Sequence, residues 1–304
     1  MMKVEVFAPA KINLCLHVTG KRSDGYHLLD TLVAFADIGD TVRLSDTGPA
    51  GLDVLGPEAA PELSGKDNIM LQTAARFWPI DQPLSLQLDK QLPVASGIGG
   101  GSADAAATYR GLLWLQALAK GRDMPRDPTA RDARALMAIG ADVPMCVLSE
   151  AARVQGIGEQ ITPVEGLHPF PVVLVNPRVQ VSTPRVFFRL DNKENPGLDP
   201  WPDGFEDRNA VLEWLVAQRN DLQTPAIGCC PEIGSVLVAL AQEQNCRLAR
   251  MSGSGATCFG LFERMHLAQS AAQNIRAAHP DWWVRVGRLN GNRHAAPQLI
   301  RSTT

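Results

Sequence analysis

Hydrophobic and polar residues alternate along much of the first hundred residues, as they do in half-buried β-strands. From Ile12 to Val18 every second residue is apolar, so Lys11, Asn13 and His17 share the opposite face. Turns that contain glycine and aspartate separate this run from later apolar runs. The pattern predicts antiparallel strands over residues 4–8, 12–18, 28–38, 41–44 and 84–88, a break at Pro9 and Ala10, and a surface loop over 46–67.

A helical spacing of apolar residues replaces the alternation at several places. The stretch over 102–119 is apolar on nearly all sides, which indicates a buried central helix. The spacing predicts helices over residues 68–77, 102–119, 130–139, 210–218, 231–245 and 265–278, the first with Asp67 or Asn68 as its cap. We also expect strands over 145–148, 159–164, 171–175, 247–251 and 258–262, a helix start at Ser182, Thr183 and Pro184, and a frayed tail from Gly291.

Composition narrows the class of protein. The 304 residues suffice for two domains, and we place the boundary between residues 151 and 168. A net charge of −3 argues against wholesale nucleic-acid binding, and no apolar run reaches the roughly 18 residues of a membrane span. The N-terminus lacks the apolar core of a signal peptide, and the six cysteines lack the spacing of zinc ligands. We therefore expect a cytoplasmic protein without nucleic-acid or membrane partners.

The most informative stretch is rich in glycine and runs directly into the predicted central helix. It holds four glycines within five residues: Gly97, Gly99, Gly100 and Gly101. Glycines let the backbone approach a ligand closely, and the free N–H groups of a helix N-terminus bind phosphate. Ser102 or a neighbour is expected to cap the helix, with Asp104 in its first turn.

Three alternatives for this loop fit less well. A P-loop needs a lysine before Ser102, and the dinucleotide fingerprint is matched only in part by Gly97, Ile98 and Gly99. A flexible linker would have polar flanks, whereas apolar segments lie on both sides here. The loop therefore predicts a phosphate site without naming the nucleotide.

Two charged residues are candidates for chemistry. Lys11 begins the polar face of the first strand pattern, and Asp142 follows a predicted helix and precedes a proline. Each also has an ordinary structural interpretation, because a lysine can extend its ammonium to solvent and an aspartate can cap a turn. A second loop of small residues, 252–257, is expected to be either a tight hairpin or a wall of the phosphate site.

Five motifs occur in one order, and their combination is more specific than any one of them. They are Pro-Ala-Lys-Ile-Asn-Leu at 9–14, Asp-Gly-Tyr-His at 24–27, the glycine-rich loop at 93–102, Gly-Ala-Asp-Val-Pro at 140–144 and Gly-Ser-Gly-Ala at 253–256. Together they resemble the small-molecule kinase family that includes galactokinase, homoserine kinase and mevalonate kinase. Within it, the chain is similar to members that phosphorylate a cytidyl-diphosphate methylerythritol in the non-mevalonate isoprenoid pathway.

The resemblance, which covers about residues 9–262, implies a fold and an activity. It implies an α+β fold with a ribosomal protein S5 domain 2-like domain over 1–160 and a ferredoxin-like domain over 161–304. It also implies phosphorylation of the substrate's 2-hydroxyl, with ATP and Mg²⁺ as cofactors and a small molecule as partner, by a monomer or weak homodimer. Asp142 corresponds to the catalytic aspartate and Lys11 to its basic partner.

The remaining site residues are carried over from the same motifs. Tyr26 and Phe187 would stack on cytosine, His27 would bind its edge, and Asn13 and Thr183 would surround the methylerythritol end. No protein ligand for the metal stands out, and the role of Asp104 is open because an anion there would repel ATP. ATP would bind Asn68, Pro93, Val94, Ala95, Ser96, Gly97, Ile98, Gly99, Gly100, Gly101 and Ser102.

Three competing hypotheses remain. A kinase of the same fold could act on homoserine or mevalonate, although Tyr26, His27 and Phe187 argue for an acceptor that carries a base. A Rossmann-type oxidoreductase would use Gly97 and Gly99 for a dinucleotide. A non-catalytic nucleotide-binding regulator would not need Asp142.

Overall fold

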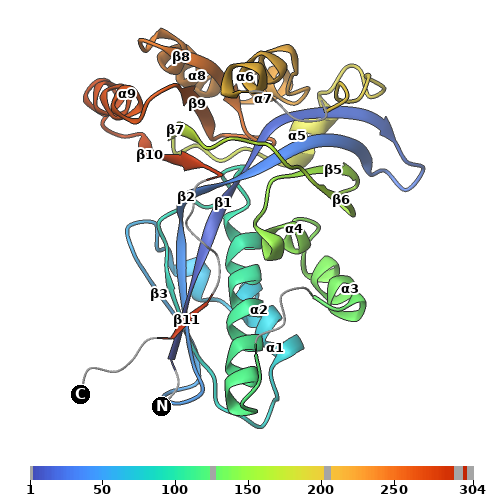
Figure 1. Ribbon diagram of the computed structural model, residues 1–304, viewed down its shortest axis with the longest axis vertical. Helices are drawn as coiled ribbons and strands as arrows, with labels where there is room; N and C mark the ends of the chain where they lie inside the picture. Colours follow the sequence, from blue (N-terminus) through green and yellow to red (C-terminus); the bar gives the residue numbers. More distant parts are fainter. Residues whose placement is uncertain (1–2, 124–127, 202–206, 291–296, 300–304) are drawn as a thin grey trace.

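Two long antiparallel strands form the axis of the fold (Figure 1), in the computed structural model that describes residues 3–123, 128–201, 207–290 and 297–299. Strand β1 (Lys3–Lys21) pairs with β2 (His27–Ser45), and both run through the two halves of the molecule. The predicted break at Pro9 and the predicted interruption at Gly39, between strands 28–38 and 41–44, are wrong. A register shift between Pro9 and Lys11 takes up the proline, which cannot donate a ladder hydrogen bond.

The N-terminal half extends this ribbon into a larger sheet. Strands β4 (Ser85–Asp89) and β5 (Ala152–Gly156) pair with different stretches of β2. The prediction of a loop over 46–67 is wrong in part, because β3 (Gly51–Leu55) pairs in parallel with β4 and a 3₁₀ helix follows at Pro61–Ser64. The sheet is completed by β6 (Gln160–Pro163) beside β5 and β11 (Gln298–Leu299) beside β1.

Helix α2 (Gly100–Ala119) packs against β1 and β2 and fills the core of this half, which confirms the predicted central helix. Its alanine-rich first turns allow the close approach. The predictions for α1 (Ile69–Phe77) and α3 (Ala130–Ile139) are also confirmed, and the helix α4 (Val143–Leu148) follows α3. The side chains of Asn68 and Thr129 cap α1 and α3 and fix where these helices begin.

The C-terminal half is a four-stranded antiparallel sheet in the order β10-β7-β9-β8, with α8 and α9 packed against it. Its strands are β7 (Phe170–Asn176), β8 (Cys246–Met251), β9 (Cys258–Phe262) and β10 (Trp283–Leu289). Its helices are α5 (Thr183–Phe188), α6 (Arg208–Ala217), α7 (Gln223–Cys229), α8 (Glu232–Gln242) and α9 (Met265–Ala278). The sequence patterns missed β10 and α7 in this half, and β5 in the other, and placed the remaining elements of the C-terminal half correctly.

The two halves share one continuous sheet, because Leu289 on β10 pairs with Ala36 on β2. Part of the expected frayed tail is instead ordered, since Gln298 and Leu299 pair with Glu5 and Val4; residues 291–296 and 300–304 lie outside the described residues. In the part of the chain that the structure describes, no helix has the length and apolar character needed to cross a membrane.

Candidate active site

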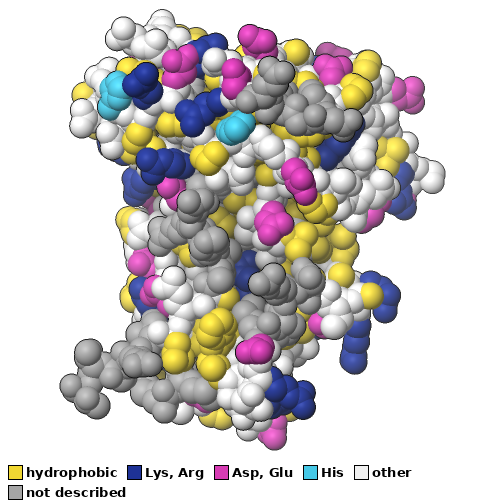
Figure 2. All heavy atoms as spheres, viewed as in Figure 1, with side chains coloured by type: hydrophobic (Ala, Val, Ile, Leu, Met, Phe, Trp, Pro, Cys, Tyr) yellow, Lys and Arg dark blue, Asp and Glu magenta, His cyan; other side chains and the backbone are white. Residues whose placement is uncertain are grey.

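A cavity of about 660 Å³ lies where the two halves meet. Residues of β1, α2 and the glycine-rich loop line it together with residues of α5 and the loop between β8 and β9. Figure 2 shows hydrophobic side chains at the surface near the waist of the molecule, between its two halves. The cavity therefore collects four of the five motifs that the sequence suggested belong together, from positions as far apart as Lys11 and Gly255.

The glycine-rich loop enters α2 without a side-chain cap. Gly99 occupies the N-cap position with a φ of 64°, so the prediction that Ser102 caps the helix is wrong. Gly97, with a φ of 75°, also needs a left-handed backbone. The loop is fixed to β1 by the bond from the Lys11 N–H to the Ile98 carbonyl at 2.9 Å. The first N–H groups of α2 are consequently available to an anion in the cavity.

The second small-residue loop, residues 252–255, forms a wall against the first. The N–H of Thr257 donates to the Ser96 carbonyl at 3.0 Å, and the hydroxyl of Ser252 donates to the Gly97 carbonyl at 3.1 Å. A β-carbon on Gly97 would lie 2.5 Å from the carbonyl oxygen of Gly255. Both interpretations of this loop therefore hold in part: it closes the β8–β9 hairpin, where the Ser252 N–H donates to the Thr257 carbonyl at 2.9 Å, and it forms a wall against the glycine-rich loop.

We expect Gly97→Ala to reduce activity roughly 10- to 100-fold, because relief of this clash must displace one of the two loops. Steady-state assays at varied ATP concentration would measure the loss. Gly121→Ala is the matched control, since Gly121 also has a positive φ but no atoms near its β-carbon position. Near-normal activity of Gly97→Ala would show that the contact between the loops is dispensable.

Lys11 and Asp142 form an ion pair beside the glycine-rich loop. The Lys11 Nζ lies 2.7 Å from an Asp142 oxygen, and the side chains are 8% and 38% exposed. Both line the cavity, so the lysine is buried while its partner can be reached by a ligand. This geometry is unlike that of a lysine that extends into solvent.

Asp142 occupies the N-cap position of α4, so the predicted strand over 145–148 is wrong. The short apolar run gave no periodicity to distinguish the two structures. Pro144 suits the first turn of a helix, and the buried guanidinium of Arg110 donates to the carbonyls of Cys146 and Val147 at its end. The Asp142 side chain makes no capping bond, which leaves it free for Lys11.

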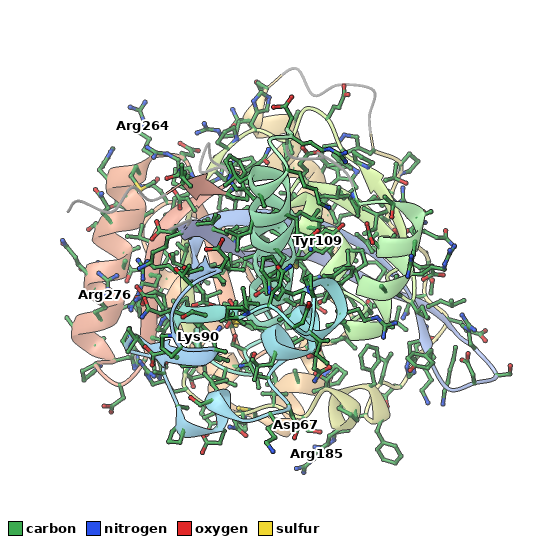
Figure 3. All side chains as sticks on the ribbon, turned by 90° about the horizontal axis from the view of Figure 1, so that it is seen from below. Asp67, Lys90, Tyr109, Arg185, Arg264 and Arg276 are labelled. Carbon is green, nitrogen blue, oxygen red and sulfur yellow. The ribbon has the colours of Figure 1, made fainter. Side chains whose placement is uncertain are left out.

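Asp104 does not face the cavity as an isolated anion. Helix α2 begins at Gly100, so Asp104 lies beyond the first turn and not within it as expected. Its carboxylate lies 2.9 Å from the Nζ of Lys90, which also contacts Asp40 at 2.5 Å. All three side chains are buried, and in Figure 3 Lys90 lies inside the fold, whereas Arg264 points away from it. The lysine balances the negative charge that the sequence left unexplained.

Lys90, Asp40 and Asp104 form what we call the buried triad, and the pKa values of Lys90 and Asp104 are shifted. Desolvation raises the pKa of Asp104 well above its usual value, although Lys90 opposes the shift. Desolvation alone would lower the pKa of Lys90, but the carboxylates of Asp104 and Asp40 outweigh it, so the lysine pKa is raised. Lys90 and Asp40 belong to none of the sequence motifs and were not predicted as part of the site. The one sequence signal for Lys90 is the charged Asp89-Lys90 step just before the apolar segment that leads into the loop.

The predicted acceptor residues fall into two groups. Asn13, Thr183 and Phe187 line the cavity, and the hydroxyls of Thr183 and Ser254 lie 2.7 Å apart. His27 stacks on Phe187 with 4.6 Å between ring centroids. Burial, with a contribution from nearby lysines, lowers the pKa of His27.

Tyr26 is the least integrated of the predicted acceptor residues. It lies next to His27 at the end of the β1–β2 hairpin and is 61% exposed. Among the described residues, Tyr26 and His27 are not part of the cavity lining. The structure thus brings Phe187 and His27 together and leaves Tyr26 at the edge of the site.

Asn68 lines the cavity, but its amide is already engaged. Its Oδ1 accepts from the N–H of Met70 at 2.8 Å and its Nδ2 donates to the Leu63 carbonyl at 2.6 Å. Nine of the ten residues from Pro93 to Ser102, all predicted to contact the nucleotide, line the same cavity. Ile98 is the exception, since its side chain is fully buried in the core.

Comparison with known proteins gives the family. Models described as GHMP kinases N terminal domain and GHMP kinases C terminal match residues 68–150 and 206–281. The 4-diphosphocytidyl-2-C-methyl-D-erythritol kinases of Dinoroseobacter shibae and Ruegeria pomeroyi are 52% and 51% identical to the chain. The first alignment covers 91% of this chain and 92% of the relative, and the second covers 95% and 100%.

Solved structures agree with the sequence relatives. A crystal structure of 4-(cytidine 5'-diphospho)-2C-methyl-D-erythritol kinase superposes with a TM-score of 0.75 at 32% identity, covering 95% of this chain and 100% of that one. Homoserine kinase from Cytophaga hutchinsonii superposes with a TM-score of 0.60 at 17% identity, covering 98% and 97%, which indicates a shared fold alone. The chain therefore belongs to the GHMP kinases and, within them, to the 4-diphosphocytidyl-2-C-methyl-D-erythritol kinase family.

Proposed function

We propose that this protein transfers the γ-phosphoryl group of ATP to the 2-hydroxyl of 4-diphosphocytidyl-2-C-methyl-D-erythritol. The products are the 2-phosphate and ADP, in the non-mevalonate route to isoprenoid precursors. The observation that carries the proposal is the 2.7 Å Lys11–Asp142 pair on the wall that also holds the glycine-rich loop. The relatives at about 50% identity support this acceptor over homoserine or mevalonate.

Asp142 and Lys11 perform complementary tasks in the proposed reaction. The acceptor hydroxyl gives its proton to the Asp142 carboxylate as its oxygen bonds to the γ-phosphorus, and the bond to the ADP oxygen breaks. Phosphoryl transfer needs positioning and charge stabilisation more than covalent help. The Lys11 ammonium, buried and fixed 2.7 Å from Asp142, orients the carboxylate and stabilises charge on the transferring group.

The glycine-rich loop is the proposed triphosphate site. Its backbone N–H groups and the uncapped start of α2 supply donors that suit phosphate oxygens. Mg²⁺ neutralises phosphate charge when bound, and the triphosphate, the Ser102 hydroxyl and water would hold most of its coordination sphere. Among the described residues, no group of three His, Cys, Asp or Glu side chains is placed to hold a metal ion.

The rest of the cavity is assigned to the acceptor. Phe187 offers a ring face to the cytosine, and Tyr26 would cover the opposite face of the base. The buried Nε2 of His27 has no partner among the described residues and would bind the base edge. Asn13 and Thr183 also line the cavity and would surround the methylerythritol end.

Release of ADP in the presence of Mg·ATP and a panel of acceptors tests this proposal. We expect turnover with 4-diphosphocytidyl-2-C-methyl-D-erythritol and none with homoserine, mevalonate or galactose. Turnover with one of the other alcohols would keep the kinase but overturn the roles given to Tyr26, His27 and Phe187. Nucleotide binding without turnover of any acceptor would favour the regulator, and nicotinamide absorbance of the purified protein would favour the oxidoreductase.

We further propose a fold for each of the two domains, a cellular location and an oligomeric state. The order β7, helices, β8, β9, α9, β10 supports the name ferredoxin-like for residues 161–304, and residues 1–160 would form the S5 domain 2-like domain. The protein would act in the cytoplasm as a monomer or weak homodimer. It would have neither nucleic-acid nor membrane partners.

A further inference from the structure

Two hydrogen bonds fix Asn13 on the wall of the cavity, one through its backbone N–H and one through its side-chain amide. Its backbone N–H donates to the Ser252 hydroxyl at 3.1 Å, and its Nδ2 donates to the Thr31 hydroxyl at 2.9 Å. Asn13 and Thr31 both line the cavity from the adjacent strands β1 and β2, and each is 3% exposed. The Asn13 amide therefore has a fixed position and a fixed tilt.

The Cys15 carbonyl fixes the orientation of the Asn13 amide, that is, which of Oδ1 and Nδ2 faces Thr31. Oγ1 of Thr31 is 2.5 Å from this carbonyl oxygen. A carbonyl can only accept, so the single hydroxyl proton of Thr31 must point to Cys15. Oγ1 of Thr31 must then accept a proton from Asn13, which requires the Nδ2 group and not Oδ1 on that side. Oδ1 is left on the opposite side as an acceptor.

This Oδ1 atom of Asn13 is buried and has no hydrogen-bond partner among the described residues. It lies 3.3 Å from the point that a β-carbon on Gly253 would occupy, and Gly253 lines the same cavity. Buried acceptors are nearly always paired, and an unpaired one is costly. A ligand that reaches it must bring a donor, such as a hydroxyl group.

We infer that Thr31 is a positioning residue that presents Asn13 as a hydrogen-bond acceptor to a hydroxyl of the sugar-alcohol part of the substrate. The inference rests on the proposed function and makes it more specific. Thr31 acts through Asn13, and its effect is confined to the alcohol end of the substrate. An analogue with an ether or carbonyl oxygen in place of that hydroxyl would meet Oδ1 lone pair to lone pair and bind poorly.

The test is Thr31→Val, which keeps the shape of the side chain but removes the hydroxyl. We expect the KM for the cytidyl-diphosphate methylerythritol to rise about tenfold, because the amide can then rotate and lose its acceptor role. The KM for ATP and the inhibition constant of cytidine diphosphate, which lacks the alcohol, should stay within about twofold of wild type. Thr31→Ser, which restores the hydroxyl, should recover most of the affinity.

A double-variant cycle separates this role from a merely structural one. If Thr31 acts through Asn13, then Thr31→Val should add little to the loss caused by Asn13→Ala. Thr73→Val is a control, because Thr73 is a fully buried threonine on α1 whose hydroxyl donates to the Ile69 carbonyl of the same helix, and Thr73 does not line the cavity. Thr31→Ala serves in the cycle if the valine variant does not fold.

The inference, but not the proposed function, would be overturned by an unchanged KM for the acceptor in Thr31→Val or by an equal weakening of cytidine diphosphate binding. Additive losses in the cycle would do the same. A wild-type protein that binds ATP but does not phosphorylate this acceptor would instead overturn the proposed function, and the inference with it.

Discussion

Replacement of Asp142 by alanine is expected to reduce kcat by about 10²–10⁴-fold, the range typical of a positioned general base. The carboxylate is the only group in the proposed reaction that can take the proton of the acceptor hydroxyl. Lys11→Met should also lower kcat strongly, because the carboxylate loses the ammonium 2.7 Å away that orients it. Steady-state kinetics with saturating Mg·ATP and acceptor would measure both losses.

The activity loss of the Asp142 variants should not come from unfolding. The Asp142 side chain makes no capping bond to α4 and is 38% exposed, so its removal leaves the helix start intact. Asp207→Ala is a matched control at a true cap: it removes two bonds to the start of α6, far from the reaction, and should lower stability but not kcat. Near-full activity of Asp142→Asn would contradict the role of Asp142 as a base and leave it a residue that positions the alcohol.

Local signals in the sequence were sufficient wherever local contacts decide the structure. Asn68 and Thr129 cap the helices that follow them by bonds within three residues, and the amphipathic pattern of those helices predicts their extent. The failure at residues 145–148 has the opposite cause. That turn of helix depends on Arg110, which reaches its carbonyls from α2 and is 36 residues away in sequence from Cys146.

The long strands show the same limit. Pro9 and Gly39 look like breaks one at a time, yet they face each other in the ladder, and a bulge next to Pro9 lets both strands continue. The bulge between Asn13 and Cys15 also breaks the alternation, so Leu16, and not His17, lines the cavity with Lys11 and Asn13. Strict period-two reasoning cannot find such a shift.

At the site, the motif residues that line the cavity could be predicted from the sequence. The buried residues that support them from beneath could not. The glycine-rich loop and Lys11 stand out in sequence by composition and pattern. Asp40 and Lys90 are 50 residues apart, and neither belongs to a motif. Only packing brings them together beneath the loop. The role of Asp104 was therefore open in the sequence, whereas the structure shows it as a salt-bridge partner of Lys90.

The buried triad leads to the largest expected effect on stability. Lys90→Met should lower the free energy of unfolding by about 3–5 kcal/mol, because it leaves two buried carboxylates without their shared counter-ion. Asp40 would keep two partners, the N–H groups of Gln91 and Leu92, so most of the penalty falls on Asp104. Urea unfolding followed by tryptophan fluorescence would measure the change.

The opposite variant should behave differently, and the contrast tests the account of the triad. A raised pKa of Asp104 means that the folded state takes up a proton more readily than the unfolded state, so ionised Asp104 opposes folding at neutral pH. Asp104→Asn should therefore not lower the free energy of unfolding by more than about 1 kcal/mol at pH 7. Its stability relative to wild type should decline as the pH falls toward the usual aspartate range, where the wild-type carboxyl takes up its proton. Arg247→Met, which breaks an exposed ion pair with Glu263, is the control and should cost less than about 1 kcal/mol. If Lys90→Met cost no more than Arg247→Met, the triad would not be the anchor beneath the glycine-rich loop that its geometry indicates.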